Sequence, residues 1–218
     1  MTRRWTWMTW WAAEHRDRSD ASWEPFSCSE RIANLYYLLM HMTDAQRRKV
    51  LSGPLGGFVL DSALWIVSRA EYYGPARTNN HILNNGRALV IAGMLTGNRS
   101  IAAAGTAIFT HMLPLLISGN GFLRERSSHY QLLVFLWLAE AERAMEMDPS
   151  LTSAEDRAFL RLYLERLSAA CSYLCTEQGN LKACVGDVSP DAVPEEVCSL
   201  LRELRPGWRP GSTRRTTR

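Results

Sequence analysis

Two segments of the sequence, residues 88–95 and 132–138, are apolar on nearly every side when they are read as helices. A helix without a polar face lies inside a protein, because any exposed side would leave apolar surface in water. Each of these helices therefore needs more amphipathic helices around it. The two segments predict a two-layer helical array, in which the inner layer carries the function at its ends, where the loops gather.

Apolar residues continue at helical spacing along most of the chain, and no alternating strand pattern of useful length or βαβ rhythm interrupts them. Besides the segment 79–97, helices are expected over residues 29–42, 56–74, 98–121, 127–147, 152–175 and 194–205. Pro114 is expected to bend or break the helix that contains it. The pattern predicts an all-α fold of antiparallel helical hairpins over residues 1–205, followed by a disordered basic tail at 206–218.

Residues 29–42 and 56–74 each indicate which side of a helix faces the core. The first segment places Ile32, Leu35, Tyr36 and Leu39 at helical spacing, and the second places Val59, Ala63, Ile66 and Val67 on one face.

Composition excludes several classes of protein. The chain has 218 residues, 46% of them hydrophobic and 22% charged, which is typical of a globular domain. A net charge of +3 is too small to predict nucleic-acid binding. The five cysteines include no CxxC pair, so they are expected in the core rather than around zinc. No apolar run approaches the ~20 residues that a membrane span needs.

The helix that starts near Asn80 is polar only in its first two turns. Asn80, Asn84 and Arg87 lie at i, i+4 and i+7 and share one face, with His81 and Asn85 beside it. Amide, imidazole and guanidinium groups at the positive end of a helix are suited to hold an anion such as a carboxylate. A solvent-exposed helix start with amide caps is the simpler interpretation. The opposite stripe is apolar or small: Ile82, Gly86, Leu89 and Gly93.

The second buried helix also follows a dense polar cluster, "GFLRERSSHYQ". Tyr130 falls in its first turn, so its ring is expected to rest on the core with the hydroxyl at the helix end. Arg124 and Arg126 are expected to lower the pKa of this tyrosine toward values useful for proton transfer. His129 lies about 100° around the helix and is expected to point elsewhere, as a polar residue on the loop side.

Four segments carry a resemblance to a known family: "SWEPFSCSERIANL", "NNHILNNGRALVIAG", "GNGFLRERSSHYQLLVFLWL" and "GNLKACVGD". In this order and spacing, from Trp23 to Asp187, they resemble the helical domain of the heparinase II/III-like family. The resemblance implies a polysaccharide lyase with an incomplete (α/α) toroid. Family members continue into a C-terminal β-sandwich that contributes a further catalytic histidine, and no strand-rich region in this sequence replaces it.

The resemblance assigns roles to individual residues. It places Asn80 and His81 at the carboxylate of a uronic-acid substrate, where they would stabilise the enolate that forms when the C5 proton leaves. It makes Tyr130 the acid that protonates the leaving 4-oxygen and, in some stereochemistries, also the base. Glu125 and Arg126 belong to the same block and are carried over as substrate-binding residues.

The remaining substrate-binding residues, Asn84 and Arg87, come from the helix-face argument alone. No metal or cofactor is expected for the proton transfers. The expected partners are an acidic polysaccharide or oligosaccharide and a separate β-sandwich domain or chain, with no nucleic acid and no membrane span.

Two other functions fit the same sequence. The chain could be a non-catalytic carbohydrate-binding or scaffold remnant, or a helical array that binds a protein partner, although no repeat is visible. Family analogy places the protein in the periplasm or outside the cell. The N-terminus resembles a signal peptide only loosely, so a cytoplasmic location stays open.

Overall fold

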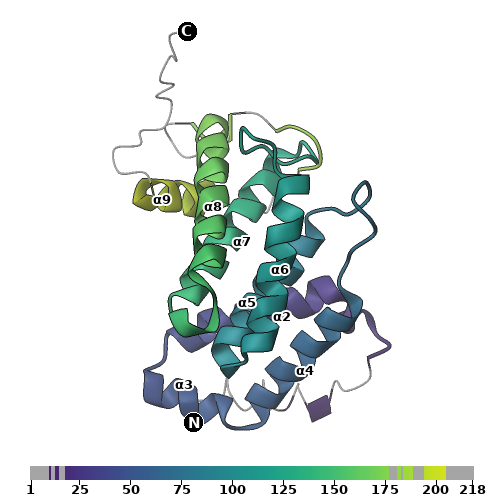
Figure 1. Cartoon of the computed structure of the whole chain (residues 1–218), viewed down its shortest axis with the longest axis vertical. Helices are drawn as coiled ribbons and strands as arrows, with labels where there is room; N and C mark the ends of the chain where they lie inside the picture. Colours follow the sequence, from purple (N-terminus) through teal and green to yellow (C-terminus); the bar gives the residue numbers. More distant parts are fainter. Residues whose placement is uncertain are drawn as a thin grey trace.

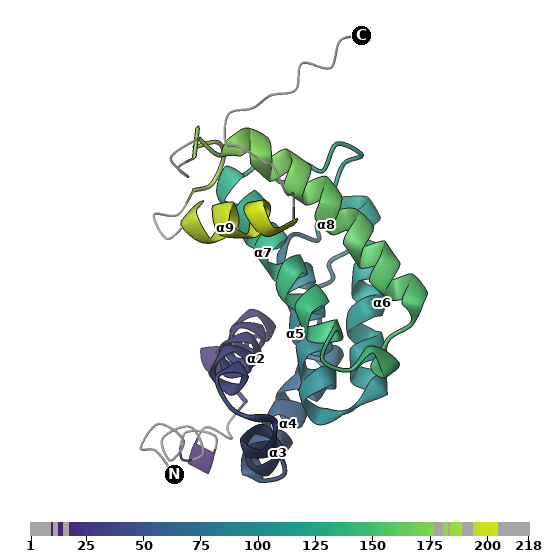
Figure 2. The ribbon, with the colours of Figure 1, turned by 90° about the vertical axis from the view of Figure 1, so that its left-hand side faces the viewer.

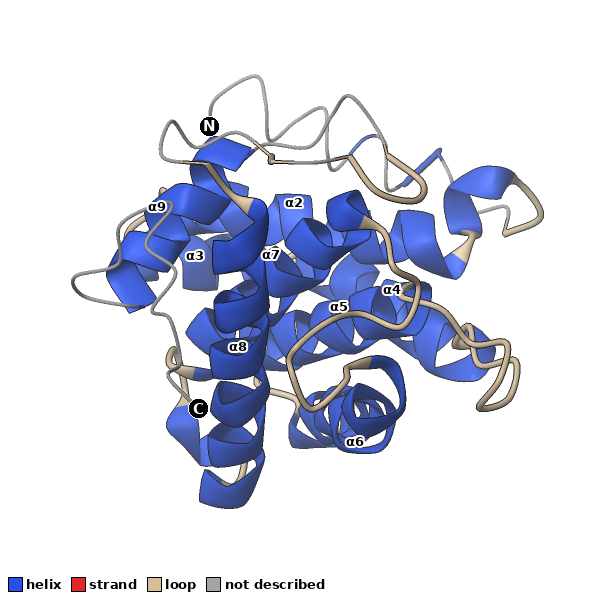
Figure 3. Cartoon of the chain, turned by 90° about the horizontal axis from the view of Figure 1, so that it is seen from above, coloured by secondary structure: helices blue, strands red, loops and turns tan. Residues whose placement is uncertain are grey.

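The computed structural model describes residues 10, 13–14, 18–176, 181–182, 184–188 and 194–204. Helices account for its regular structure, and the described residues include no β-strand (Figure 3). In chain order they are η1 (Ala21–Trp23), α2 (Pro25–Met40), α3 (Asp44–Leu51), α4 (Pro54–Arg69), α5 (His81–Thr96), α6 (Arg99–Leu116), α7 (Ser128–Met145), η2 (Pro149–Leu151), α8 (Ala154–Leu174) and α9 (Pro194–Leu204).

The helices form two layers (Figure 1). The inner layer consists of α5 and α7, and the outer layer consists of the helices that pack around them. α5 packs on α2 at one side and on α6 at the other, and α7 packs on α5, α8 and α9 (Figure 2). Residues 88–95 of α5 are all buried, and so are most residues of the 132–138 segment. The prediction of two inner helices surrounded by amphipathic ones is confirmed.

Small residues let α5 and α6 approach each other closely. A Cβ atom built on Gly93 would lie 2.6 Å from the backbone nitrogen of Ala102. One built on Gly105 would lie 2.7 Å from the carbonyl oxygen of Gly86. Real Cβ atoms do not approach backbone atoms so closely, so these glycines are required. The apolar or small stripe predicted for α5 is the face that meets α6.

α2 and α4 bury most of the residues that their periodicity indicates. Ile32, Leu35, Tyr36 and Leu39 are all buried. Val67 is a correction, because its side chain is 46% exposed. The buried stripe of α4 also contains Leu55 and Ser62, which moves its centre away from Val67.

Helix boundaries differ from the sequence patterns in three places. α3, which no pattern indicated, is fixed by a capping box between Thr43 and Gln46. α4 ends at Arg69, five residues before the predicted Gly74. α6 is not broken at Pro114 and continues to Leu116. The proline lies in the last turn, so the backbone hydrogen bond that its missing N–H cannot make is lost close to where the helix ends.

Two further expectations concern the ends of the chain and the absence of a membrane span. The tail at 206–218 and the first nine residues lie outside the described residues. Among the residues that the structure describes, no single helix is long and apolar enough to cross a membrane, while α3 and α4 together, bent by 70°, meet the length and composition.

Candidate active site

The polar start of α5 faces carboxylates of the chain itself. Asn80 occupies the N-cap position, and its backbone N–H and side-chain amide donate to Glu125 at 2.7 and 2.8 Å. Arg124, one residue earlier, donates to the backbone carbonyls of Pro75 and Thr78 just before α5. These contacts hold the segment that precedes α7 against the N-cap of α5 and the residues just before it. The N-terminal ends of the two inner helices therefore lie at the same end of the array.

His81 forms an ion pair with Glu71, from the loop between α4 and α5. Its Nδ1 lies 2.9 Å from Glu71 Oε1, and Asn85 donates to the other oxygen at 3.1 Å. The hydrogen bond that His81 donates to Glu71 raises the pKa of His81, although partial burial opposes the rise. The imidazole also packs on Phe26, with ring centroids 4.7 Å apart. His81 thus keeps its Nδ1 occupied, while its side chain remains 40% exposed.

Arg87 lies deeper in α5 and bridges two helices. Its guanidinium donates to Glu30 of α2 at 2.6 Å and to Glu140 of α7 at 2.7 Å. It also lies over the ring of Trp137, 5.2 Å from the centroid. Asn84 donates to the same Glu30 oxygen at 2.9 Å and is fully buried. The interpretation of a solvent-exposed helix start is therefore wrong for Asn84 and Arg87, whose groups connect α5 to α2 and α7.

Tyr130 sits in the first turn of α7, where the Ser127 side chain accepts from its backbone N–H. Its hydroxyl donates to Asp187 Oδ2 at 2.7 Å. This bond is the main cause that raises the pKa of Tyr130, and the charges of Asp187 and Glu125 add to it. The expectation of a lowered pKa is wrong, because the phenol donates to the Asp187 carboxylate and the charge of Glu125 acts in the same direction.

Arg126 and His129, which belong to the same polar cluster, differ in exposure. Arg126 is exposed, and its backbone φ of 55° lies in the left-handed region that side chains rarely adopt. His129 is buried, not a loop-side residue as expected, and its ring centroid lies 5.5 Å from that of Tyr130.

A pocket of about 650 Å³ lies between α2, α7 and α9. Arg87, Glu140 and Trp137 line it, and it reaches along α7 to Leu133, one helical turn beyond Tyr130. Asn80, His81 and Tyr130 do not line it. Its full lining is Glu30, Ala33, Asn34, Tyr37, Arg87, Leu133, Leu136, Trp137, Ala139, Glu140, Arg143, Glu196, Ser199, Leu200 and Glu203.

The structure thus divides the sequence-predicted residues into two groups. Asn80, His81, Glu125 and Tyr130 lie at the shared end of α5 and α7, whereas Asn84 and Arg87 are enclosed between helices. Within the described ranges, no group of three or more histidine, cysteine or acidic side chains is placed to hold a metal ion.

Sequence reasoning missed several acidic partners of these residues. One had a usable signal, because Glu140 is the charged residue in the apolar run "LLVFLWLAEA" and a buried charge requires a partner. Asp187 ends the last of the resembling segments, but nothing local linked it to Tyr130. The missed partners are Glu30, Glu71, Glu140 and Asp187.

Comparisons with known proteins give a structural relative. The sequence matches no protein-family model and no curated protein. Among solved structures, that of heparinase III matches with a TM-score of 0.58 and 19% identity, over 80% of this chain and 28% of that one. At this identity the match shows the fold. It confirms the prediction of an all-helical, incomplete (α/α) toroid, and this chain spans 28% of the length of heparinase III.

Proposed function

We propose that the chain is the helical part of a polysaccharide lyase that cleaves uronic-acid-containing glycans by β-elimination. The observation that carries this proposal is the pairing of Glu125 with Asn80, which brings the start of α5 and the start of α7 together. Asn80, His81 and Tyr130, three groups that could act on one sugar, are thereby held at one end of the toroid. The structural likeness to heparinase III supports the same class of reaction.

His81 and Asn80 are suited to neutralise the substrate carboxylate. The raised pKa of His81 favours its charged form, which would attract a uronate. Because Nδ1 is held by Glu71, Nε2 is the nitrogen that would donate to the substrate. The Asn80 amide has two N–H groups, and one of them is used by Glu125. Both residues would stabilise the enolate that forms when C5 loses its proton.

Tyr130 would complete the elimination by moving a proton at its phenolic oxygen. As the bond between C4 and the leaving 4-oxygen breaks, the phenol would donate its proton to that oxygen. The product would be an unsaturated sugar at the new chain end. Arg126, which is exposed beside this turn, would contact acidic groups of the glycan chain.

A panel of uronic-acid polymers tests the proposal, with the ultraviolet absorbance of the 4,5-unsaturated product as the readout. The chain should be assayed alone and together with any β-sandwich domain encoded beside it. Tyr130→Phe should abolish product formation, whereas Tyr173→Phe, at an exposed tyrosine of α8, should leave it unchanged. No unsaturated product from any polymer in either format would overturn the proposal.

Non-catalytic glycan binding is the second candidate. It is favoured because the guanidinium of Arg87 is already paired with Glu30 and Glu140. The hydroxyl of Tyr130 likewise already donates its proton to Asp187. This function predicts glycan binding that survives Tyr130→Phe and is weakened by His81→Gln. Turnover by the wild-type chain would exclude it.

A further inference from the structure

The loop between α4 and α5, residues 70–80, projects from the side of the helical array (Figure 1) and is held in one shape by its own contacts. The backbone N–H of Tyr73 donates to the Thr78 hydroxyl oxygen at 2.9 Å, and that hydroxyl donates to the carbonyl of Gly74 at 2.7 Å. Gly74 has a φ of 87°, in the left-handed region that favours glycine. Arg124, from the segment before α7, donates to the carbonyl of Thr78. The loop is therefore closed on itself and fastened to the end of the array where α5 and α7 begin.

The same loop reaches the candidate active site through Glu71. The backbone N–H of Glu71 donates to Asn85 Oδ1 at 3.0 Å, and its carboxylate pairs with His81. Two tyrosines, Tyr72 and Tyr73, follow Glu71 directly in the chain. Their backbone is thus held next to the residue that pairs with His81.

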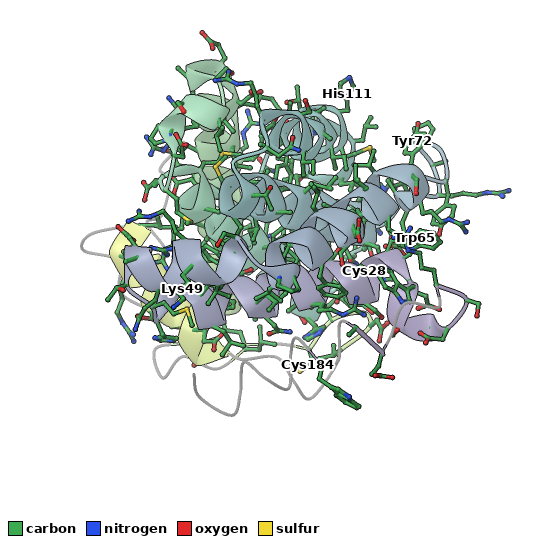
Figure 4. The ribbon with its side chains drawn as sticks, turned by 90° about the horizontal axis from the view of Figure 1, so that it is seen from below. Cys28, Lys49, Trp65, Tyr72, His111 and Cys184 are labelled. Atoms are coloured by element: carbon green, nitrogen blue, oxygen red, sulfur yellow. The ribbon has the colours of Figure 1, made fainter. Side chains whose placement is uncertain are left out.

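Tyr72 and Tyr73 are exposed although the loop that carries them is held in place. They are 54% and 62% exposed, and Figure 4 shows Tyr72 on this loop. Among the residues that the structure describes, neither ring stacks on another ring and neither hydroxyl has a hydrogen-bond partner. An exposed aromatic ring leaves apolar surface in water, and adjacent exposed rings on a fixed loop are typical of a binding surface.

The charge of the loop favours an acidic ligand. Arg77 is exposed and forms no ion pair with the described residues, whereas the acidic residue of the loop, Glu71, is already paired with His81. A guanidinium binds carboxylates through two parallel hydrogen bonds. A tyrosine ring offers an apolar face for the C–H groups of a sugar ring and a hydroxyl for its polar edge. Aromatic faces beside a cation therefore match an acidic sugar, which carries both kinds of group.

We propose that Tyr72, Tyr73 and Arg77 form an accessory subsite, which binds an acidic glycan beyond the sugar held at His81. A neighbouring sugar of the same chain packs on the tyrosine rings, and its carboxylate pairs with the Arg77 guanidinium. The inference rests on the proposed function, because it takes the glycan at His81 as given. The subsite makes affinity rise with chain length, since only a longer oligosaccharide reaches from His81 to the loop.

Removal of the two rings is the first test. Binding of heparin, alginate and hyaluronan is measured by affinity electrophoresis for the double variant Tyr72→Ala with Tyr73→Ala. Tyr173→Ala, at an exposed tyrosine of α8, is the matched control. The double variant should bind about tenfold more weakly to a polymer that the wild type binds, because the apolar area that the rings bury is lost, while the control should not change. Unchanged affinity in the double variant, or no binding of any polymer by the wild type, would overturn the proposal.

The charge is tested by Arg77→Gln, with Arg48→Gln as its matched control. Arg48 is exposed on α3, which lies at the opposite end of α4 from the loop. Arg77→Gln should weaken polymer binding and reduce its dependence on salt concentration, because one ionic contact is lost. A salt dependence equal to that of the wild type would show that the guanidinium does not contact the glycan, and the subsite as described would be wrong.

Nitration of tyrosines by tetranitromethane identifies what covers the loop. Tyr72 and Tyr73 should react quickly in the free protein and slowly with bound polymer, while Tyr173 should react at the same rate in both. Protection by a β-sandwich domain, without protection by the polymer, would make the loop a protein contact and contradict the proposal.

Turnover separates this inference from the proposed function. If unsaturated product forms, the double variant should have a raised KM for long oligosaccharides, with kcat and the KM for short ones unchanged. An unchanged KM for long oligosaccharides would remove the subsite and leave the lyase function standing. If no product forms but the double variant loses affinity for the polymer, the lyase function fails and the loop is a subsite of a protein that binds glycan without cleaving it.

Discussion

Glu125 accepts a hydrogen bond from Asn80 on each of its two carboxylate oxygens, one from the backbone N–H and one from the side-chain amide. Asn80 is the N-cap of α5, but its own side chain caps no backbone N–H of that helix. Glu125 therefore connects the positive end of α5 to the segment that leads into α7. The relative position of the two helix starts depends on this pair.

Glu125→Gln should destabilise the protein, because the amide of glutamine cannot accept on both sides and one donor of Asn80 loses its partner. Hydrogen bonds to charged groups contribute about 1.5–3 kcal/mol, and we expect a loss of free energy of unfolding in that range. Denaturant unfolding of Glu165→Gln, an exposed glutamate of α8, is the control and should stay within about 0.5 kcal/mol of the wild type. Equal stability of the two variants would show that the pair does not hold the helix ends together.

Arg87→Met should be more damaging, because it leaves Glu30 and Glu140 without the guanidinium that joins them. Breaking a buried ion pair costs about 3–5 kcal/mol, and the partial exposure of Glu30 places the expected loss near the lower value. The double variant Arg87→Met with Glu140→Gln should recover part of the lost stability, since one unpaired charge is removed.

Arg161→Met is the matched control for Arg87. Arg161 also contacts two glutamates, but it is exposed on α8, so its loss should cost less than about 1 kcal/mol. Equal costs at the two arginines, measured by denaturant unfolding, would contradict the view that Arg87 connects α5 to α2 and α7.

The spacing of Asn80, Asn84 and Arg87 correctly indicated one helix face, since local periodicity determines which residues share a face. It could not indicate what meets that face. The partner of Arg87 on α2 lies 57 residues away in sequence, and the partner on α7 lies 53 residues away. Such pairs depend on how helices pack, and each local pattern here allowed several packings.

Tyr130 illustrates the same limit for electrostatics. Arg124 and Arg126 are near it in sequence, which suggested a positive environment. Arg124 instead donates to backbone carbonyls before α5. The hydroxyl of Tyr130 donates to the carboxylate of Asp187, which lies 57 residues away in sequence. Closeness in sequence therefore predicted a lowered pKa for Tyr130, whereas the contacts in the folded chain raise it.

The ion pair between His81 and Glu71 should make stability depend on pH. Because the pKa of His81 is raised in the folded state, its contribution is complete below the ordinary value of about 6.5 and is lost as pH rises through the folded value. A double-mutant cycle with His81→Gln and Glu71→Gln isolates the coupling. The coupling free energy from unfolding should be larger at about pH 5.5 than at about pH 9. A coupling of equal size at both pH values would mean that the pair gains nothing from the charge of His81.

Cysteine reactivity tests the packing of α7, α8 and α9 independently of any activity. All five cysteines are free thiols; Cys184 is exposed in the segment 184–188, while Cys28 and the remaining three are buried (Figure 4). Burial raises the pKa of Cys171 and raises that of Cys175 to about 12, which leaves little reactive thiolate at neutral pH. A thiol reagent should therefore label one cysteine quickly in the folded protein and all five after unfolding. Mass spectrometry should place the fast label on Cys184, and Cys184→Ser should remove it. Rapid labelling of Cys171 or Cys175 in the folded protein would show that α8 does not pack on α7 and α9 as described.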